Sequence, residues 1–512
     1  MAIQHNVDHV RQELIDILPR YEMIEDCLEG EYAVKEKKTT YLPKPNPTDT
    51  SAANQSRYED YIKRAIFYNV TARTSDALVG QIFLRPPEIE LPELLGPIEE
   101  NANGEGLDII QLTKEACNYV LPYGRGGMLT DYPTTEGMVS RGDIMEGRVR
   151  PTIRFYKPQD IINWETRVIG NETVLTMVVL KEVFERRDEG SFKVSKYEQF
   201  RALELLDDGC VRVSIFVYDA DHRGMDRERV YTICDVEGNE FGKIPFTFIG
   251  SENNDPYIDR PPLYTMSVLN IAHYRNSADY EESLYFIGQP TLFIAGVTED
   301  WVKDVWKGTL RLGARGVIPG PPDSSASLIQ ATPNSLAKEG MDQKEEQMIS
   351  VGAKLVERKS GVERKEKEIE IEAAGDTSIL TSIAQNVEEA VVESLKFAAR
   401  FVGADESQIK FNVNKNFDLT SLTAEELRQI NEIADSDNPV LSFEERRAIV
   451  KRSGYAFQPL EEAKAAIAQD METRAAFAKL MAEATNVNPV NPDTGNQEPT
   501  QQEIDFDESQ QR

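Results

Sequence analysis

The strongest constraint on the fold is a long polar helix that ends at a short insert. Residues 261–288 begin with Pro261 and Pro262, which suit a first helical turn, and end at Gly288, just before Pro290. About 26 residues at ~1.5 Å each predict a rod of ~39 Å. Its middle, residues 270–279, is polar on nearly every face, which is typical of a helix that bridges two domains or packs against copies of itself.

The insert after this helix is compact and is followed by a second rod. Residues 289–333 start with a predicted strand at 291–295 and a short helix at about 299–309, and then become rich in Gly, Pro and Ser. Residues 334–358 predict another long helix. Two rods therefore flank one small insert, which predicts a stalk that carries a tip.

In the chain before the stalk, the spacing of apolar residues changes once, from a helical to a strand period. Apolar residues at helical spacing predict helices at 7–29, 57–82 and 107–121, with a kink or split at Pro19 and a loop at 40–55. From 126 to 250 apolar and polar residues alternate between turn signals, and 174–184, 211–218 and 230–234 are the clearest strands. Helices followed by an antiparallel sheet predict an α+β fold.

The chain after the stalk starts with a charged run. Residues 357–372 mix lysines, arginines and glutamates, and Asp376-Thr377-Ser378 then offers an N-cap. The helix that follows carries an apolar stripe, and residues 404–484 are also predicted helical. The last 28 residues are acidic and nearly free of aromatics, so we expect them to be disordered. The stripe consists of Leu380, Ile383, Val387, Val391, Leu395, Ala398 and Val402.

Composition excludes several classes of protein. Among 512 residues, 88 are acidic and 57 basic, a formal charge of −31. That charge argues against a general nucleic-acid coat but not against a protein that DNA passes without sticking. The four cysteines are scattered without a CxxC pair, so we expect free thiols rather than a zinc ribbon or a disulfide framework. No signal core or membrane span is predicted, which favours a soluble protein made in a cytoplasm.

Four stretches together resemble one known family. Residues 261–290 (PPLYTMSVLNIAHYRNSADYEESLYFIGQP) resemble the portal proteins of tailed bacteriophages, closest to a portal family that is described only as a domain of unknown function. Residues 123–133, 156–164 and 373–378 are similar to the same family. The resemblance covers roughly residues 5–405.

The resemblance implies a domain plan for this chain. A portal subunit has an α+β wing, a stem of two helices, a small α/β clip, a tunnel loop, a long channel-proximal helix and a helical crown. The plan assigns the wing to 1–260, the stem to 261–288 and 334–358, and the clip to 289–333. It assigns the tunnel loop to 359–378, the long wing helix to 379–403, the crown to 404–484 and a disordered acidic tail to 485–512.

The resemblance also implies a function and a set of partners. Portal proteins form a homo-oligomeric ring, usually a dodecamer, at one capsid vertex of the virion and are assembled in the host cytoplasm. The ring is the channel for double-stranded DNA during packaging and ejection. It contacts the terminase large subunit, then a head-completion or adaptor protein of the neck and tail, and also the major capsid and scaffolding proteins. The resemblance implies no enzyme activity, cofactor, metal or membrane.

Three groups of residues are candidates for functional sites. The channel candidates are Lys359, Arg364, Lys365 and Lys367, for which a solvated, charge-balanced run is the alternative. The clip docking candidates are Trp301, Lys303, Trp306, Lys307 and Arg311. The three cations are four residues apart and would share one helical face, and large aromatics together with cations suit a motor contact, although the tryptophans could instead form a subunit interface. The stem candidates are Asn270, His273, Tyr274, Arg275 and Asp279.

Other constellations favour structural roles. The run Gly124-Arg125-Gly126-Gly127 lacks the context of a phosphate-binding loop and predicts a turn. His273 and Asp279 lie six residues apart on a helix, on different faces, so they do not predict an acid/base pair. No hydrolase, metalloprotease or kinase motif is present. Another virion structural protein, such as an internal head protein, and less favourably a nuclease or hydrolase, remain the alternatives.

Overall fold

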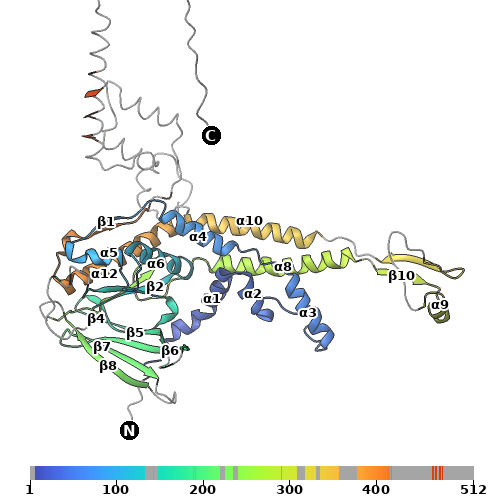
Figure 1. Ribbon diagram of the computed structural model, residues 1–512, viewed down its shortest axis with the longest axis horizontal. Coiled ribbons are helices and arrows are strands. Elements are labelled where there is room, and N and C mark those ends of the chain that lie inside the picture. Colours follow the sequence, from blue (N-terminus) through green and yellow to red (C-terminus); the bar gives the residue numbers. More distant parts are fainter. Residues whose placement is uncertain are drawn as a thin grey trace, which may run out of the picture. The chain divides into compact units, whose positions relative to one another are not determined.

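The computed structural model describes residues 6–132, 148–187, 192–218, 225–234, 240–289, 291–307, 318–329, 335–356 and 378–415, with a few single positions between and beyond these ranges. The chain divides into two units, Met1–Phe417 and Asp418–Arg512. All helices and strands named below belong to the first unit, which is an α+β structure, as expected (Figure 1). The candidate channel loop, most of the predicted crown and the acidic tail lie outside the described residues.

The N-terminal part is helical. Helix α1 runs through Pro19 without a break, because Pro19 is exposed on the helix surface, where water can satisfy the carbonyl that loses its hydrogen bond. The single helix expected at 57–82 is wrong: the structure has two helices separated by residues 65–69. The elements are α1 (Gln12–Glu29), α2 (Glu31–Glu36), η1 (Lys38–Thr40), α3 (Ala52–Arg64) and α4 (Val70–Ile82).

A helical layer follows and leads into the first sheet. Helix α6 (Ile109–Tyr123) starts with a capping box, in which Asp108 and Gln111 satisfy each other's backbone N–H groups. It ends at Gly124, whose φ of 74° is the left-handed conformation that favours glycine. The short elements before it are β1 (Glu88–Glu90), η2 (Glu93–Leu95) and α5 (Gly96–Glu100).

Two antiparallel sheets form the rest of the body. The three-stranded sheet has the order β3-β2-β9, from β2 (Arg125–Asp131), β3 (Thr152–Tyr156) and β9 (Phe246–Gly250). The five-stranded sheet is a meander in sequence order. It comprises β4 (Ile161–Ile169, after η3 at Pro158–Asp160), β5 (Glu172–Arg187), β6 (Val194–Leu205), β7 (Val211–Tyr218) and β8 (Met225–Ile233).

Both faces of the five-stranded sheet are covered in its middle, whereas its outer ends are exposed. Val178 and Leu180 of β5 join the core that contains Trp164, while Val179 between them faces the other side. That second face is packed by Val7 and Val10 of the N-terminal segment. The alternation along β5 is the period of two expected for a strand.

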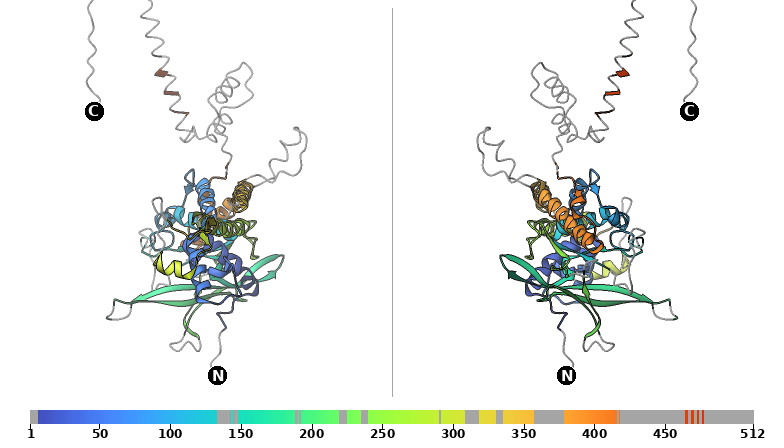
Figure 2. Two further views of the ribbon diagram at one scale, coloured as in Figure 1. Left: turned by 90° about the vertical axis from the view of Figure 1, so that its right-hand side faces the viewer. Right: turned by 90° about the vertical axis from the view of Figure 1, so that its left-hand side faces the viewer.

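Helix α12 (Ile379–Val402) organises the core. Ser378 caps it by accepting the backbone N–H of Thr381 at 3.1 Å, and all seven residues of the predicted stripe are buried. The helix contacts β2, β9 and α6, and in Figure 2 it lies, in orange, over the green strands. After α12 the chain forms η4 (Glu406–Gln408) and β12 (Lys410–Asn412), which pairs with β1. The expectation of continuous helix from 404 is therefore wrong at its start, because Phe411 is buried as a strand residue opposite Ile89.

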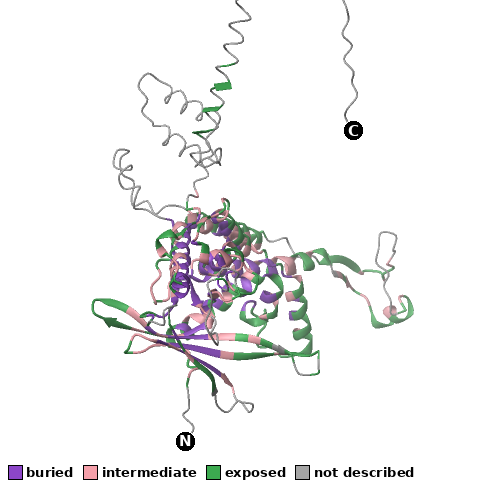
Figure 3. Ribbon diagram, turned by 60° about the vertical axis from the view of Figure 1, so that its left-hand side comes forward, coloured by how far each residue is buried: buried purple, intermediate pink, exposed green. Residues whose placement is uncertain are grey.

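The stalk has the predicted order of elements. Helix α8 (Tyr264–Gly288) is followed by β10 (Thr291–Ala295), α9 (Glu299–Asp304), β11 (Ser325–Ile329) and α10 (Leu336–Val356). Strands β10 and β11 pair as an antiparallel ribbon, Thr291 opposite Ile329. The partner strand β11 was not predicted. Figure 3 shows no buried residue in this ribbon, where β11 is exposed and β10 is mostly intermediate, whereas the first turns of α8 lie in the buried body.

Candidate functional site

The two long helices of the stalk pack side by side. In Figure 1 α8 and α10 run along each other, with the β10–β11 ribbon beyond the end of α8. The approach is close at Gly340, where a Cβ atom would lie 2.7 Å from Nδ2 of Asn276. Among the residues of α10 only Met348 and Leu355 are buried. Most of α10 is therefore exposed to solvent within a single chain.

The polar middle of α8 is buried against its own chain. Asn270 is fully buried, and its Oδ1 accepts the backbone N–H groups of Val70 (3.2 Å) and Thr71 (3.1 Å). Its Nδ2 donates to the carbonyl of Tyr68 at 2.8 Å. The Ser277 hydroxyl donates to the carbonyl of Ile66 at 2.7 Å. In return, Oγ of Ser277 accepts the backbone N–H of Ile66 at 3.1 Å.

These contacts correct the prediction for the stem. The buried polar side chains of α8 need no second copy or second domain as a partner, because they form hydrogen bonds with backbone N–H and carbonyl groups around the break between α3 and α4. Residues 65–69 leave the helical conformation there, and their polar groups would otherwise be buried without partners. Only the exposed residues of α8 and α10 are available for contacts with other molecules.

Three further stem candidates contact the N-terminal part of the chain. Tyr274 is 1% exposed and packs edge-on against Phe67, with ring centroids 6.1 Å apart. Arg275 donates from Nε to the carbonyl of Tyr41 at 2.6 Å. Asp279 accepts a hydrogen bond from the Tyr61 hydroxyl at 2.6 Å, and burial together with this carboxylate raises the pKa of Tyr61. All three hold α8 to the body.

His273 connects the two stalk helices. It is 2% exposed, and its Nε2 lies 3.4 Å from Oε1 of Glu345 on α10. Burial lowers the pKa of His273, while the Glu345 carboxylate opposes that effect. His273 and Asp279 have separate partners, so the structure places them as expected for residues on different helical faces.

The tip brings its two tryptophans together. The indole N–H groups of Trp301 and Trp306 both donate to the carbonyl of Pro319, at 3.2 and 2.9 Å. Helix α9 ends at Asp304, earlier than expected, and Lys307 has a φ of 48°. Lys303 is therefore helical and pairs with Glu299 at 2.6 Å, whereas Lys307 does not continue its helical face. Arg311 lies outside the described residues. Of the predicted row of three cations, the structure therefore tests only Lys303 and Lys307, which do not share one helical face.

The channel candidates Lys359, Arg364, Lys365 and Lys367 also lie outside the described residues. Their role remains a prediction from the sequence and the resemblance.

Sequence reasoning missed a group at the C-terminal end of α8. Glu282 pairs with Arg64 and, at 3.5 Å, with Arg57, both on α3. The guanidinium groups of these arginines lie 4.3 Å from the Tyr285 ring and 5.6 Å from the Phe286 ring, respectively. Leu284, Tyr285 and Phe286 are nevertheless 45%, 44% and 50% exposed. The consecutive large apolar residues next to Gly288 were the available signal.

The run 124–127 has a structural role, but the turn expected of it is wrong beyond Gly124, because residues 125–127 begin strand β2. Arg125 is 1% exposed and donates from Nη1 to the carbonyls of Pro256 (3.0 Å) and Tyr257 (2.7 Å), in the loop that leads to α8. Its guanidinium lies 4.4 Å from the Trp164 ring, and burial lowers the pKa of Arg125 to about 10. A Cβ atom at Gly127 would meet the ring of Phe246 at 2.3 Å. The glycines therefore make room for neighbouring side chains.

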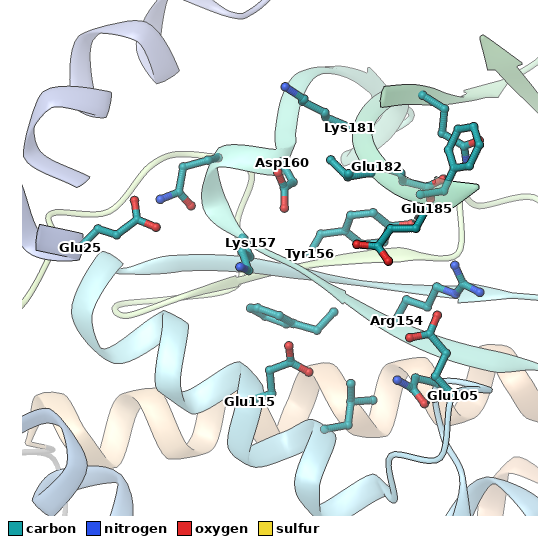
Figure 4. A pocket seen from close by; sticks show the side chains of 17 residues that line it. Glu25, Glu105, Glu115, Arg154, Tyr156, Lys157, Asp160, Lys181, Glu182 and Glu185 are labelled. Atoms are coloured by element: carbon teal, nitrogen blue, oxygen red, sulfur yellow. Dashed lines mark hydrogen bonds between the residues drawn. The ribbon is translucent and has the colours of Figure 1, made fainter. Parts of the chain in front are cut away.

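The body contains a polar cavity of about 850 Å³, shown in Figure 4. Burial raises the pKa of Glu25, Glu115 and Asp160, three carboxyl groups of its wall. Burial acts the same way on Glu182, but the Arg201 guanidinium, with Nε 2.8 Å from Oε1, holds the pKa of Glu182 below its usual value. Lys157, Lys181 and Arg154 also line the cavity, so its charge is mixed.

Neither a metal site nor a membrane span emerges from the described residues. No group of three or more His, Cys, Asp or Glu side chains among them could hold a metal ion. None of the helices described in the structure is both long and apolar enough to cross a membrane.

Comparison with known proteins gives one family match. Residues 262–402, from α8 to α12, match the family model called "Domain of unknown function (DUF4055)". No curated protein matches the chain.

Solved structures of gene transfer agent (GTA) particles are also similar. A chain in the neck of the native particle, computed with C12 symmetry, has 15% identity and a TM-score of 0.40, over 74% of this chain and 89% of that one. A chain in the neck of the empty particle, computed with C6 symmetry, has 14% identity and a TM-score of 0.38, over 78% and 93%. A chain in the native virion has 12% identity and a TM-score of 0.38, over 81% and 98%.

Proposed function

We propose that this chain is the subunit of a portal ring at one capsid vertex of a tailed phage or phage-like particle. The observation that carries the proposal is the stalk: α8 and α10 pack along each other and flank one small ribbon tip. A ring around a channel needs such paired rods, whereas an internal head protein or a hydrolase does not. The sequence resemblance to portal proteins supports the same assignment.

The charge of the chain suits a conduit. A formal charge of −31 repels DNA phosphates, so a duplex could slide through a ring of such subunits without tight binding. The cations proposed for the tunnel loop, Lys359, Arg364, Lys365 and Lys367, would give transient contacts to the backbone. We propose that the chain has no catalytic role and that the terminase ATPase supplies the energy of packaging.

Exposed apolar side chains on the stalk suit contacts between copies. Tyr285 and Phe286 on α8 are about half exposed, and Ile349 on α10 is 69% exposed. Groups of large apolar residues at the surface mark interaction sites. Tyr285 and Phe286 lie near the end of α8, whereas Ile349 lies one turn after Glu345, which faces His273, so the stalk has two such places. We infer that neighbouring copies cover both in a ring, in which α8 and α10 of each copy form the stem.

The remaining partners follow from the same assignment. The tip, with Trp301, Trp306 and Lys303 exposed or half-buried, is the proposed docking surface for the terminase large subunit and then for the head-completion protein. The body would contact the major capsid and scaffolding proteins. The ring would pass double-stranded DNA inward during packaging and outward during ejection.

The first experiment measures mass and symmetry. The purified chain is passed through size exclusion with light scattering, and the same fraction is imaged by electron microscopy. We expect rings with a central hole. Phe286→Glu should shift the mass toward the single chain, whereas Phe192→Glu, on an exposed phenylalanine of the body, should leave rings intact.

Two other results are informative. Rings that form only after scaffolding or capsid protein is added keep the proposal and move the question to the control of assembly. A chain that stays monomeric with and without these proteins contradicts it.

A further inference from the structure

Two of the four cysteines directly adjoin the last paired residues of two antiparallel strands. Strands β7 and β8 are antiparallel, and their last Cα partners are Val211 and Ile233. One residue further along the same register come Cys210, before β7, and Cys234, after β8. The two cysteines therefore lie at the end of the strand pair that is remote from the connecting residues 219–224.

The backbone hydrogen bonds indicate whether Cys210 occupies a hydrogen-bonded or a non-hydrogen-bonded position toward β8. The N–H of Leu206 donates to the carbonyl of Cys210 at 2.9 Å, so the backbone of Cys210 is engaged toward β6. In an antiparallel sheet, a residue bonded to one neighbouring strand occupies a non-hydrogen-bonded position toward the other. Cys234 forms its own antiparallel bridge with Glu240. Glu240 also lies close to Gly209, the neighbour of Cys210, where a Cβ atom would be 2.8 Å from Oε2 of Glu240.

The spacing at such positions suits a disulfide. Opposed residues in non-hydrogen-bonded positions have Cα atoms about 4.5 Å apart, and disulfides span Cα distances of about 4.4–6.8 Å. The two side chains also point to the same face. Val211 and Ile233, one step inward on each strand, are both buried in the core, so the alternation along each strand turns both cysteines to the opposite face.

The two thiols are accessible, unlike the others. Cys210 is half-buried and Cys234 is exposed, whereas Cys27 and Cys117 are buried, and all four are free thiols in this structure. Partial desolvation and the carboxylates of Asp208 and Glu240 raise the pKa of Cys210, and the Cys234 thiol adds to this effect. Because the thiolate is the reacting species, oxidation should accelerate as the pH rises.

We propose that Cys210 and Cys234 are a reversible modification site, in which a small disulfide such as oxidised glutathione converts the thiol pair into a cross-strand disulfide. One thiolate attacks the S–S bond of glutathione disulfide, forms a mixed disulfide and releases one glutathione thiolate. The second thiolate attacks the protein sulfur of that mixed disulfide and releases the second glutathione. The protein loses two electrons and two protons, and the glutathione disulfide is reduced to two thiols.

The bond would fasten an edge of the five-stranded sheet. Strand β8 is the last strand in the order β4-β5-β6-β7-β8, so it is held from one side alone among the described strands. A disulfide at its C-terminal end would restrain it from separating from β7. Exposed disulfides are the easily reduced class, so the bond would form outside a reducing cytoplasm and open within one.

The test uses the full-length chain and does not depend on the ring. Reduced protein is incubated with oxidised glutathione, denatured without reductant and analysed by intact mass and peptide mapping. We expect the wild type to lose two of its four thiols and the mass of two hydrogens, with a peptide pair linking Cys210 to Cys234. Reduced glutathione in excess should restore both thiols.

The variants distinguish the pair from unspecific oxidation. Cys210→Ser and Cys234→Ser should each retain a stable glutathione adduct on the remaining cysteine, and the double variant Cys27→Ser/Cys117→Ser should behave as the wild type. Glutathione adducts without the internal bond in the wild type, a bond between chains, or no reaction of either cysteine overturns the proposal.

Discussion

Asn270 on α8 fixes the start of α4 through Thr71. Its Oδ1 accepts both the backbone N–H (3.1 Å) and the hydroxyl (2.9 Å) of Thr71, across 199 positions of sequence. The same side chain donates to Tyr68. One amide thus satisfies buried polar groups at the chain break between α3 and α4, and it attaches the stalk to the N-terminal helices.

Replacing this amide should destabilise the body. Asn270→Ala leaves buried backbone groups without partners, and we expect the free energy of unfolding to fall by about 3 kcal/mol. Val268→Ala, at a 40% exposed position of the same helix, is the matched control and should change it by much less. Denaturant unfolding at one fixed protein concentration measures both, because the stability of an oligomer depends on concentration. Equal effects of the two variants would contradict the assigned role.

The break between α3 and α4 shows where sequence reasoning stops. Residues 57–82 carry a helical stripe, which favoured one helix over the local signal of Asn69, the N-cap of α4, whose Oδ1 accepts the backbone N–H of Ala72 at 3.0 Å. The side chains that form hydrogen bonds with the backbone groups exposed by the break, Asn270 and Ser277, lie about 200 positions away on α8. Long-range polar contacts of this kind leave no trace in local periodicity, so one long helix was predicted where two exist.

Helix α12 shows the opposite case. Its stripe follows the helical period, and Ser378 supplies the cap, so its buried face and its start were predictable from local rules. Strands β11 and β12 were missed because each is short and stabilised by a distant partner, β10 and β1. The candidate site divides in the same way: the order of the stalk was predicted, whereas the polar contacts of α8 were not.

The buried His273 predicts a pH dependence of stability. Burial holds the pKa of His273 below its ordinary value of about 6.5, with Lys344 acting in the same direction and Glu345 and Asp342 opposing. The unfolded chain therefore binds a proton at a higher pH than the folded chain. The free energy of unfolding should fall as the pH is lowered through about 6.5 and continue to fall until the folded pKa is passed.

A variant isolates this contribution. In His273→Gln the wild-type decline in stability below about pH 6.5 should become smaller, whereas His9→Gln, at an exposed position, should keep it. Chemical unfolding midpoints between pH 7.5 and 5 give the comparison. A His273→Gln profile parallel to the wild type would show that other groups cause the decline.

The contacts of the tip predict that substitutions of Trp306 weaken terminase binding to different degrees. Trp306→Ala removes the indole that donates to Pro319 and its apolar surface, and we expect the affinity of rings for the terminase large subunit to fall about tenfold, about 1.4 kcal/mol. Trp306→Phe removes the hydrogen bond and keeps most of the surface, so its loss should be smaller. Val305→Ala, the exposed neighbour, serves as the control. Binding to immobilised rings measures all three, and unchanged binding of Trp306→Ala would leave Trp306 with a role in the tip alone.

The tunnel-loop hypothesis predicts a charge effect at four positions. Replacing Lys359, Arg364, Lys365 and Lys367 by Gln removes the cations that are proposed to contact the DNA backbone. Rings should assemble normally, but the packaged DNA length or its retention should decrease, measured by nuclease-protected DNA per particle.

The control must change the charge of the ring equally. Four exposed cations of the body, each in a surface ion pair of little energetic value, can be replaced by Gln together: Lys63, Arg167, Lys196 and Lys410. If packaging depends on contacts within the loop, this variant should package DNA as the wild type does. If both variants lose the same amount of DNA, the total charge of the ring is responsible. If neither loses any, the charged run is a solvated segment without a role in DNA transport.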